Sequence, residues 1–168
     1  WKSPHYVYSC AVDNRISVLM SDYKLSDDMC LRFSDRSWNE YPLMADKYID
    51  WIANLPQSEE VITIGMELCA IGMFQPLSSN ILDFIKALPV CAAQRGIGFA
   101  TPAELVENRK AVDTIDVPYP MSWNDEERDI SGWLGNTMQR EAFAKLYEEK
   151  LVGRILACKD RRIKQDWD

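Results

Sequence analysis

The residue best suited to chemistry is a glutamate that follows a short apolar run. Residues 61–64 are rich in β-branched side chains, which predicts a buried strand, and Glu67 lies just beyond its end. Its neighbours are mostly apolar, so we expect desolvation to raise the pKa of the carboxyl group. Such a group can act as a general acid near neutral pH. The alternative is a structural carboxylate that pairs with an arginine or caps a helix.

A second group of acidic and aromatic side chains surrounds residue 128. Carboxylates accept hydrogen bonds from sugar hydroxyls, and an indole ring can pack on the apolar face of a pyranose. This pattern favours carbohydrate binding, and the alternative is a solvated turn in which an aspartate caps the next helix. The candidate residues are Trp123, Asp125, Asp129 and Trp133.

Two further features favour structural roles. The adjacent carboxylates of Asp27 and Asp28 could bind a metal ion, but the nearby Arg32 favours a helix cap and an internal ion pair. His5 is the single histidine and is expected to be a surface or packing residue, which argues against a histidine triad or a multi-histidine metal site. We therefore predict neither a metal ion nor a cofactor.

The bulk properties restrict the partners. The chain has 168 residues, a net charge of -7 and a pI near 4.8, which argue against binding to nucleic acid or to an anionic membrane surface. No stretch is as long as a membrane span. Five cysteines without a C-x-x-C pair favour a reduced, cytoplasmic setting.

The order of the expected elements indicates an α/β fold. Residues 1–15 are expected to be irregular, and residues 16–23 fit a strand or a short helix. Strands are expected over 61–64, 96–99 and 114–117, and helices over 42–54, over 77–88 with Pro89 closing it, and from the capping box at Thr101. Strands that alternate with helices pair in parallel. A long amphipathic helix is expected over 136–164.

Four stretches, in the same order along the chain, resemble the α-amylase branch of glycoside hydrolase family 57. They are Leu25-Ser26-Asp27-Asp28 with Leu31-Arg32-Phe33-Ser34-Asp35-Arg36, Tyr41-Pro42-Leu43 with Ala45-Asp46-Lys47-Tyr48, Phe99-Ala100-Thr101-Pro102, and Ser122-Trp123 through Trp133-Leu134-Gly135-Asn136.

The resemblance implies a fold and an activity. Residues 1–118 would form the last part of an incomplete (β/α)7 barrel with parallel strands, and residues 119–168 a loop and a long helix of the helical region that follows. The substrate would be an α-glucan or a maltooligosaccharide, and the second group of candidate residues would line or support its cleft. The mechanism would be retaining, with a glutamate nucleophile and an aspartate acid/base.

The resemblance also places Glu67. The family's "MDYETFG" motif falls on residues 66–72, so Glu67 takes the place of the acid/base aspartate and Cys69 replaces the motif's glutamate. The family's nucleophile region has no match here, so a missing N-terminal part of the same polypeptide is expected to supply it. The alternatives are a catalytically degenerate homologue that binds maltodextrin or serves as a scaffold, and an interaction domain, so the sequence leaves open whether the protein is an enzyme.

Overall fold

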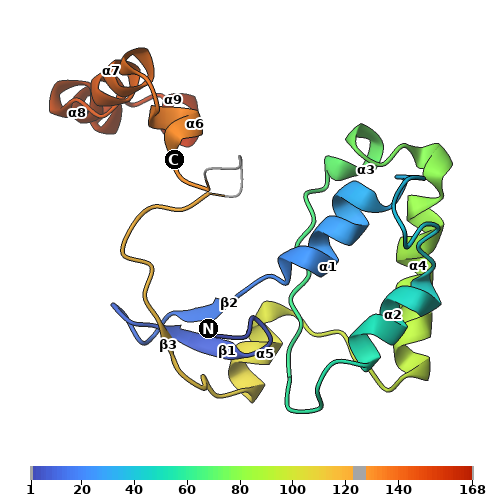
Figure 1. The fold of residues 1–168 in the computed structure, drawn as a ribbon. Helices are drawn as coiled ribbons and strands as arrows, with labels where there is room; N and C mark the ends of the chain where they lie inside the picture. Colours follow the sequence, from blue (N-terminus) through green and yellow to red (C-terminus); the bar gives the residue numbers. More distant parts are fainter. Residues whose placement is uncertain (1, 123–127, 168) are drawn as a thin grey trace. The chain divides into compact units, whose positions relative to one another are not determined.

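A computed structural model of the protein describes residues 2–122 and 128–167. The chain divides into two compact units, Trp1–Asp116 and Val117–Asp168. The first unit is an α/β structure with a small sheet, and the second contains short helices (Figure 1).

The sheet of the first unit has three strands in the order β2-β1-β3 (Figure 1). Strand β1 (Val7–Cys10) pairs antiparallel with β2 (Ser17–Leu19) and parallel with β3 (Thr114–Ile115). The prediction that the strands pair only in parallel is therefore wrong. The prediction that residues 1–15 are irregular is wrong too, because β1 lies within them. The connection between β1 and β2 is too short for a parallel crossover, which leaves a hairpin as its solution.

Two other expected strands are not formed as such. Of residues 61–64, Thr63 alone makes a bridge, in parallel with Ser21, and residues 96–99 have no strand geometry. A β-branched run becomes a strand only where a neighbouring strand accepts its backbone hydrogen bonds, because strand propensity depends strongly on context. The bridge is parallel, so the chain runs from Thr63 toward Glu67 in the same direction as the chain at Ser21.

The helices of the first unit are α1 (Tyr23–Asp27), the π-helical η1 (Asp28–Arg32), α2 (Ala45–Ala53), α3 (Ala70–Met73), the 3-10 turn η2 (Leu77–Ser79), α4 (Ile81–Gln94) and α5 (Pro102–Asn108). The three predicted helices of this unit are present as α2, α4 and α5, and further short helices that the sequence did not predict lie before and between them.

Their ends confirm one prediction and correct another. The capping box of Thr101 and Glu104 is present at the start of α5, as predicted. Pro89 does not close a helix, because α4 continues through it to Gln94. A proline inside a helix removes one backbone hydrogen bond, and packing of the apolar face of α4 offsets that loss.

An aromatic cluster holds this unit together. Helices α2 and α4 pack against each other, and Tyr48 and Ile81 are fully buried between them and the α1–η1 segment. The ring of Phe84 lies 4.9 Å from that of Phe33 and 5.6 Å from that of Tyr48. The Tyr48 hydroxyl donates to the Leu25 carbonyl at 2.9 Å, so this buried polar group is satisfied.

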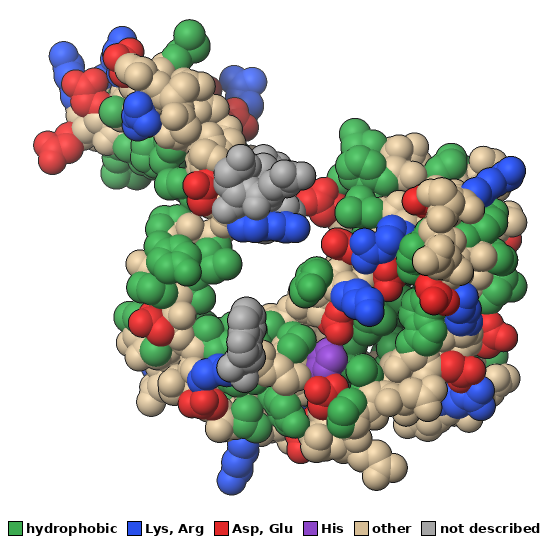
Figure 2. Space-filling model, viewed as in Figure 1, with side chains coloured by type: hydrophobic (Ala, Val, Ile, Leu, Met, Phe, Trp, Pro, Cys, Tyr) green, Lys and Arg blue, Asp and Glu red, His purple; other side chains and the backbone are tan. Residues whose placement is uncertain are grey.

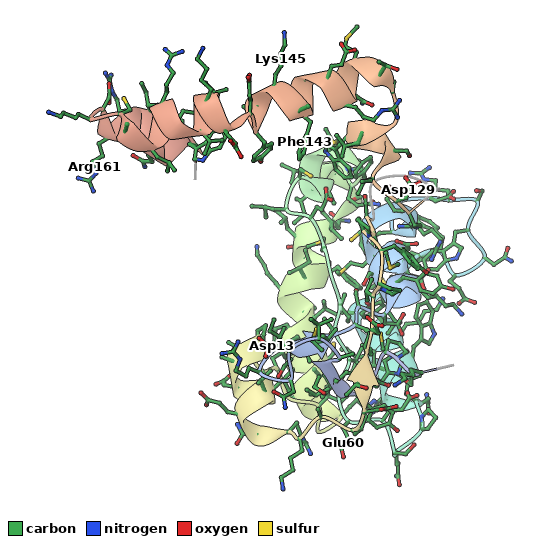
Figure 3. The ribbon with its side chains drawn as sticks, turned by 90° about the vertical axis from the view of Figure 1, so that its left-hand side faces the viewer. Asp13, Glu60, Asp129, Phe143, Lys145 and Arg161 are labelled. Carbon is green, nitrogen blue, oxygen red and sulfur yellow. The ribbon has the colours of Figure 1, made fainter. Side chains whose placement is uncertain are left out.

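The second unit does not contain the long helix expected over 136–164. It has α6 (Ser131–Leu134), α7 (Thr137–Leu146), α8 (Glu149–Ala157) and α9 (Arg161–Trp167). Phe143 and Lys145 lie on opposite sides of α7 (Figure 3). Tyr147 packs on Phe143 at 4.6 Å and on Trp167 at 5.5 Å between ring centroids. The breaks let the apolar side chains meet one another, which a single straight helix would prevent.

Candidate functional site

Glu67 lies on an exposed loop between the Thr63 bridge and helix α3. Its side chain is exposed, and its apolar neighbours Leu68 and Met73 are 84% and 71% exposed. The expected burial of Glu67 is therefore wrong for this chain. Its neighbours in sequence do not enclose the carboxyl group, because Leu68 and Met73 are exposed and the others, Ile64, Met66 and Ile71, pack against the core.

Two thiols lie near Glu67. The Cys69 thiol donates a hydrogen bond to Glu67 Oε2 at 3.2 Å, and this hydrogen bond is the main cause of the raised pKa of Cys69. The Cys30 thiol contacts the Gly65 carbonyl at 3.7 Å. Burial, followed by the negative charges of Asp27 and Glu67, raises the pKa of Cys30. The carboxylates of Asp27 and Glu67 thus act on the same thiol, although 40 residues separate them in the sequence.

The second group of candidates belongs to the other compact unit. Asp129 accepts the backbone N–H of Ser131 at 2.7 Å, at the start of α6, and hydrogen bonds from Ser131 lower the pKa of this carboxyl group. The alternative of Asp129 as a helix cap is corrected, because Ile130 occupies the N-cap position of α6 and no side chain caps this helix. The bond from Ser131 instead holds a local turn before α6. Trp133 is 51% exposed, which leaves its ring accessible. Trp123 and Asp125 lie outside the described residues.

Asp28, one of the two adjacent carboxylates, forms the internal ion pair that the sequence favoured. Arg32 Nε donates to Asp28 Oδ1 at 2.5 Å, and Asp28 is only 4% exposed. The predicted helix cap at residues 26–28 is wrong. Asp22 caps α1 instead, and its side chain accepts a hydrogen bond from the Leu25 amide at 2.9 Å. Among the described residues, no three histidine, cysteine or acidic side chains are arranged to bind a metal ion.

His5 takes part in a cluster that the sequence did not indicate. The side chain is buried, its Nδ1 lies 2.5 Å from Glu59 Oε2, and its Nε2 lies 2.8 Å from Asp22 Oδ2. The histidine lies among acidic side chains in Figure 2. Burial by itself disfavours the imidazolium, but the hydrogen bonds to Glu59 and Asp22 and their charges outweigh it and raise the pKa of His5 above 6.5. No local motif could have revealed this cluster, because its members are 17 and 54 residues apart.

The cluster is connected to the Glu67 loop by hydrogen bonds. The Asp22 amide donates to the Thr63 carbonyl at 2.8 Å, and the Ser26 hydroxyl donates to the Asp22 carbonyl at 2.6 Å. The same hydroxyl accepts the Gly65 amide at 3.1 Å. His5 therefore supports, through Asp22, the backbone that leads to Glu67.

We predict that His5 makes the stability of the protein depend on pH. Since folding raises the pKa of His5, its contribution to the free energy of unfolding is complete below pH 6.5 and is lost as the pH rises through the folded-state pKa. Urea unfolding between pH 5.5 and 8.5 should show a larger difference between the native protein and a His5→Gln variant at the acidic end. A difference that stays constant across this range would refute the stabilising interaction of protonated His5 with the carboxylates of Asp22 and Glu59.

Comparison with known proteins gives the family. The model of "Glycosyl hydrolase family 57" matches residues 1–118. A Methanocaldococcus jannaschii protein named "Putative alpha-amylase" is 36% identical over 168 residues, which cover 98% of this chain and 34% of that protein. The chain thus spans about a third of the length of this relative. No solved structure matches the chain. A family match over more than half of the chain, and this identity over nearly all of it, show that the chain belongs to glycosyl hydrolase family 57.

Proposed function

We propose that this chain is part of an α-glucan-active, α-amylase-like glycoside hydrolase in which Glu67 is the general acid/base. The observation that carries the proposal is the place of Glu67, on an exposed loop that follows the parallel bridge of Thr63. In parallel α/β folds, substrates bind at the carboxyl ends of the strands. Membership of the family and the relative named as an α-amylase support a glucan substrate.

The proposed reaction is a double displacement. Glu67 in its acid form donates a proton to the glycosidic oxygen as a carboxylate nucleophile attacks the anomeric carbon, and the resulting Glu67 carboxylate then takes a proton from the water that releases the sugar. The nucleophile would come from residues outside this chain, at about 5–5.5 Å from Glu67, as a retaining mechanism requires. Trp123, Asp125, Asp129 and Trp133 are proposed to line or support the cleft.

The same proposal extends to the fold and the setting. Residues 1–118, with their small mixed sheet, would be the last part of an incomplete β/α barrel, and residues 119–168 would belong to the helical region. All five cysteines are free thiols, which supports a reducing, cytoplasmic location. None of the helices in the described ranges has the length and apolar composition of a membrane span.

The test is an assay of the complete protein with maltoheptaose. We expect shorter maltooligosaccharides, released at first as the α-anomer, which proton NMR detects before mutarotation. The β-anomer as first product would overturn the retaining mechanism, because that configuration requires a single displacement. The absence of any turnover would overturn the enzymatic proposal itself.

One observation favours a second candidate function, a homologue that binds maltodextrin without cleaving it. Cys69 replaces the glutamate of the family motif and donates a hydrogen bond to Glu67 at 3.2 Å. This contact could hold Glu67 away from a glycosidic oxygen, and a misplacement of about 1 Å can cost about a hundredfold in rate. Calorimetry with maltoheptaose distinguishes the two functions, since binding without turnover is the result that this candidate requires.

A further inference from the structure

The first unit contains a cavity that does not involve Glu67. Its volume is about 720 Å³, within the range of about 300–1,000 Å³ that is typical of small-molecule sites. The side chains that decide its chemistry are Asp22, Asp28, Arg32, Trp38, Asn39 and Trp51. They come from the α1–η1 segment, from α2 and from the chain between these helices, so all of them belong to one compact unit.

Two carboxylates in this cavity are held in fixed positions. Asp28 is bound through Oδ1 to Arg32, and Asp22 is bound through Oδ2 to His5 and through Oδ1 to the Leu25 amide. A carboxylate offers about four acceptor positions, more than these contacts occupy. Asp22 exposes the larger part of its side chain, 15% against 5% for Asp28, so it presents fixed acceptor positions to the hydroxyl groups of a ligand while Asp28 holds Arg32 in place beside it.

Two indole rings form an apolar wall beside these carboxylates. Trp38 and Trp51 lie edge to face with their ring centroids 6.2 Å apart, and each ring has a cation close to it, Arg32 at 5.9 Å and Lys47 at 5.5 Å. Both tryptophans are half-buried, so the rings pack on the core and still reach the cavity. An apolar wall next to fixed acceptors matches a pyranose, which has C–H faces and a rim of hydroxyl groups.

The charges of the lining favour a neutral ligand. The acidic side chains of Asp22, Asp28 and Glu40 face the basic side chains of Lys24 and Arg32, so the cavity has nearly balanced charge. Asp22 and Asp28 are moreover partnered by His5 and Arg32. A phosphorylated or otherwise strongly anionic ligand would need an excess of basic groups, which this lining lacks.

The cavity and Glu67 lie on different sides of the α1–η1 segment. Lys24, Asp28 and Arg32 follow one another at intervals of four residues and thus share one side of the segment. Cys30, two residues from Asp28, points the other way and contacts the Gly65 carbonyl of the Glu67 loop. A ligand in the cavity would therefore leave Glu67 unoccupied.

We propose that this cavity is an accessory sugar-binding site, in which the indole wall and the fixed carboxylates hold a neutral pyranose unit of an oligosaccharide. The choice of an α-glucan as that oligosaccharide rests on the proposed function. The site anchors a glucan chain on this unit and takes no part in bond cleavage.

Hydrogen exchange of the complete protein, with and without maltotriose, tests the proposal. The Glu67→Gln background prevents turnover during the measurement. We expect saturating maltotriose to slow amide exchange in the segments around residues 38–40 and 51–55. Asn39→Ala should raise the maltotriose concentration that gives half-maximal protection about tenfold, because Asn39 lines the cavity. Asn39 is exposed, so its replacement should leave the fold intact. Trp38→Ala should abolish the protection.

Matched controls separate this proposal from the proposed function. Asn108→Ala changes the same residue type on α5, outside the cavity, and should leave the protection unchanged. Protection without maltoheptaose hydrolysis by the native protein supports the accessory site while the enzymatic proposal fails. Hydrolysis without protection of these segments, or protection that Asn39→Ala leaves intact, overturns the accessory site and spares the enzymatic proposal.

Discussion

Replacement of Glu67 by glutamine should lower the kcat of the complete protein on maltoheptaose by about 10²- to 10⁴-fold, the usual contribution of a general acid/base. Glutamine keeps the size of the side chain but can neither donate the proton that the leaving sugar needs nor accept one from water. The measurement is the rate of reducing-end formation, together with the urea midpoint to verify that the variant is folded.

The leaving group provides a sharper test of the same role. A 4-nitrophenyl maltoside needs no proton for departure of its phenolate, so its first chemical step should be affected far less by Glu67→Gln than the cleavage of maltoheptaose. Glu107→Gln, an exposed glutamate on α5, is the matched control and should retain the native rate on both substrates. Equal losses on the two substrates would assign Glu67 a structural role, and equal rates of variant and native protein on maltoheptaose would remove the acid/base role altogether.

Replacement of Phe84 by alanine should lower the free energy of unfolding by about 3–5 kcal/mol, because it leaves a cavity in the aromatic cluster. Phe84 is 6% exposed and contacts the rings of Phe33 and Tyr48, so its loss removes ring contacts that join α4 to α2 and to the residue that follows η1. Such a change is a large fraction of the stability of an ordinary domain, about 5–15 kcal/mol. Urea unfolding followed by tryptophan fluorescence measures it.

The control for this substitution lies on the same helix. Leu82 is 41% exposed, and Leu82→Ala should cost about 1 kcal/mol or less, since little apolar area is buried there. Similar losses for the two variants would mean that helix propensity, and not the aromatic cluster, stabilises α4. A change in the slope of the urea transition would point instead to a loss of two-state behaviour.

Local chemistry in the sequence predicted several features correctly. Thr101 and Glu104 form the expected capping box, and Asp28 and Arg32 form the expected ion pair. These interactions join residues three or four positions apart on a helix, so their geometry is already contained in the spacing of the residue types. The ordered motifs predicted the family for the same reason, because they are properties of the chain itself.

The failures have a common cause. The run at 61–64 forms a single bridge, Pro89 is accommodated inside α4, and Glu67 is exposed despite its apolar neighbours in sequence. Each of these outcomes depends on which segment packs alongside, and sequence spacing does not contain that information. The helix expected over 136–164 breaks for a related reason, since the contact of Tyr147 with Trp167 joins residues 20 positions apart.

The sequence by itself thus determined the family, the α/β class, the start of helix α5 and the choice of Glu67 as the residue to test, because residue type and spacing are enough for each. The tertiary structure alone decided the rest. It placed His5 between Asp22 and Glu59, brought Asp27 and Glu67 to the same thiol, and set the indole rings of Trp38 and Trp51 beside two fixed carboxylates. These groups come from distant parts of the chain, and only burial of a common core brings them within the few ångströms over which hydrogen bonds and ion pairs act.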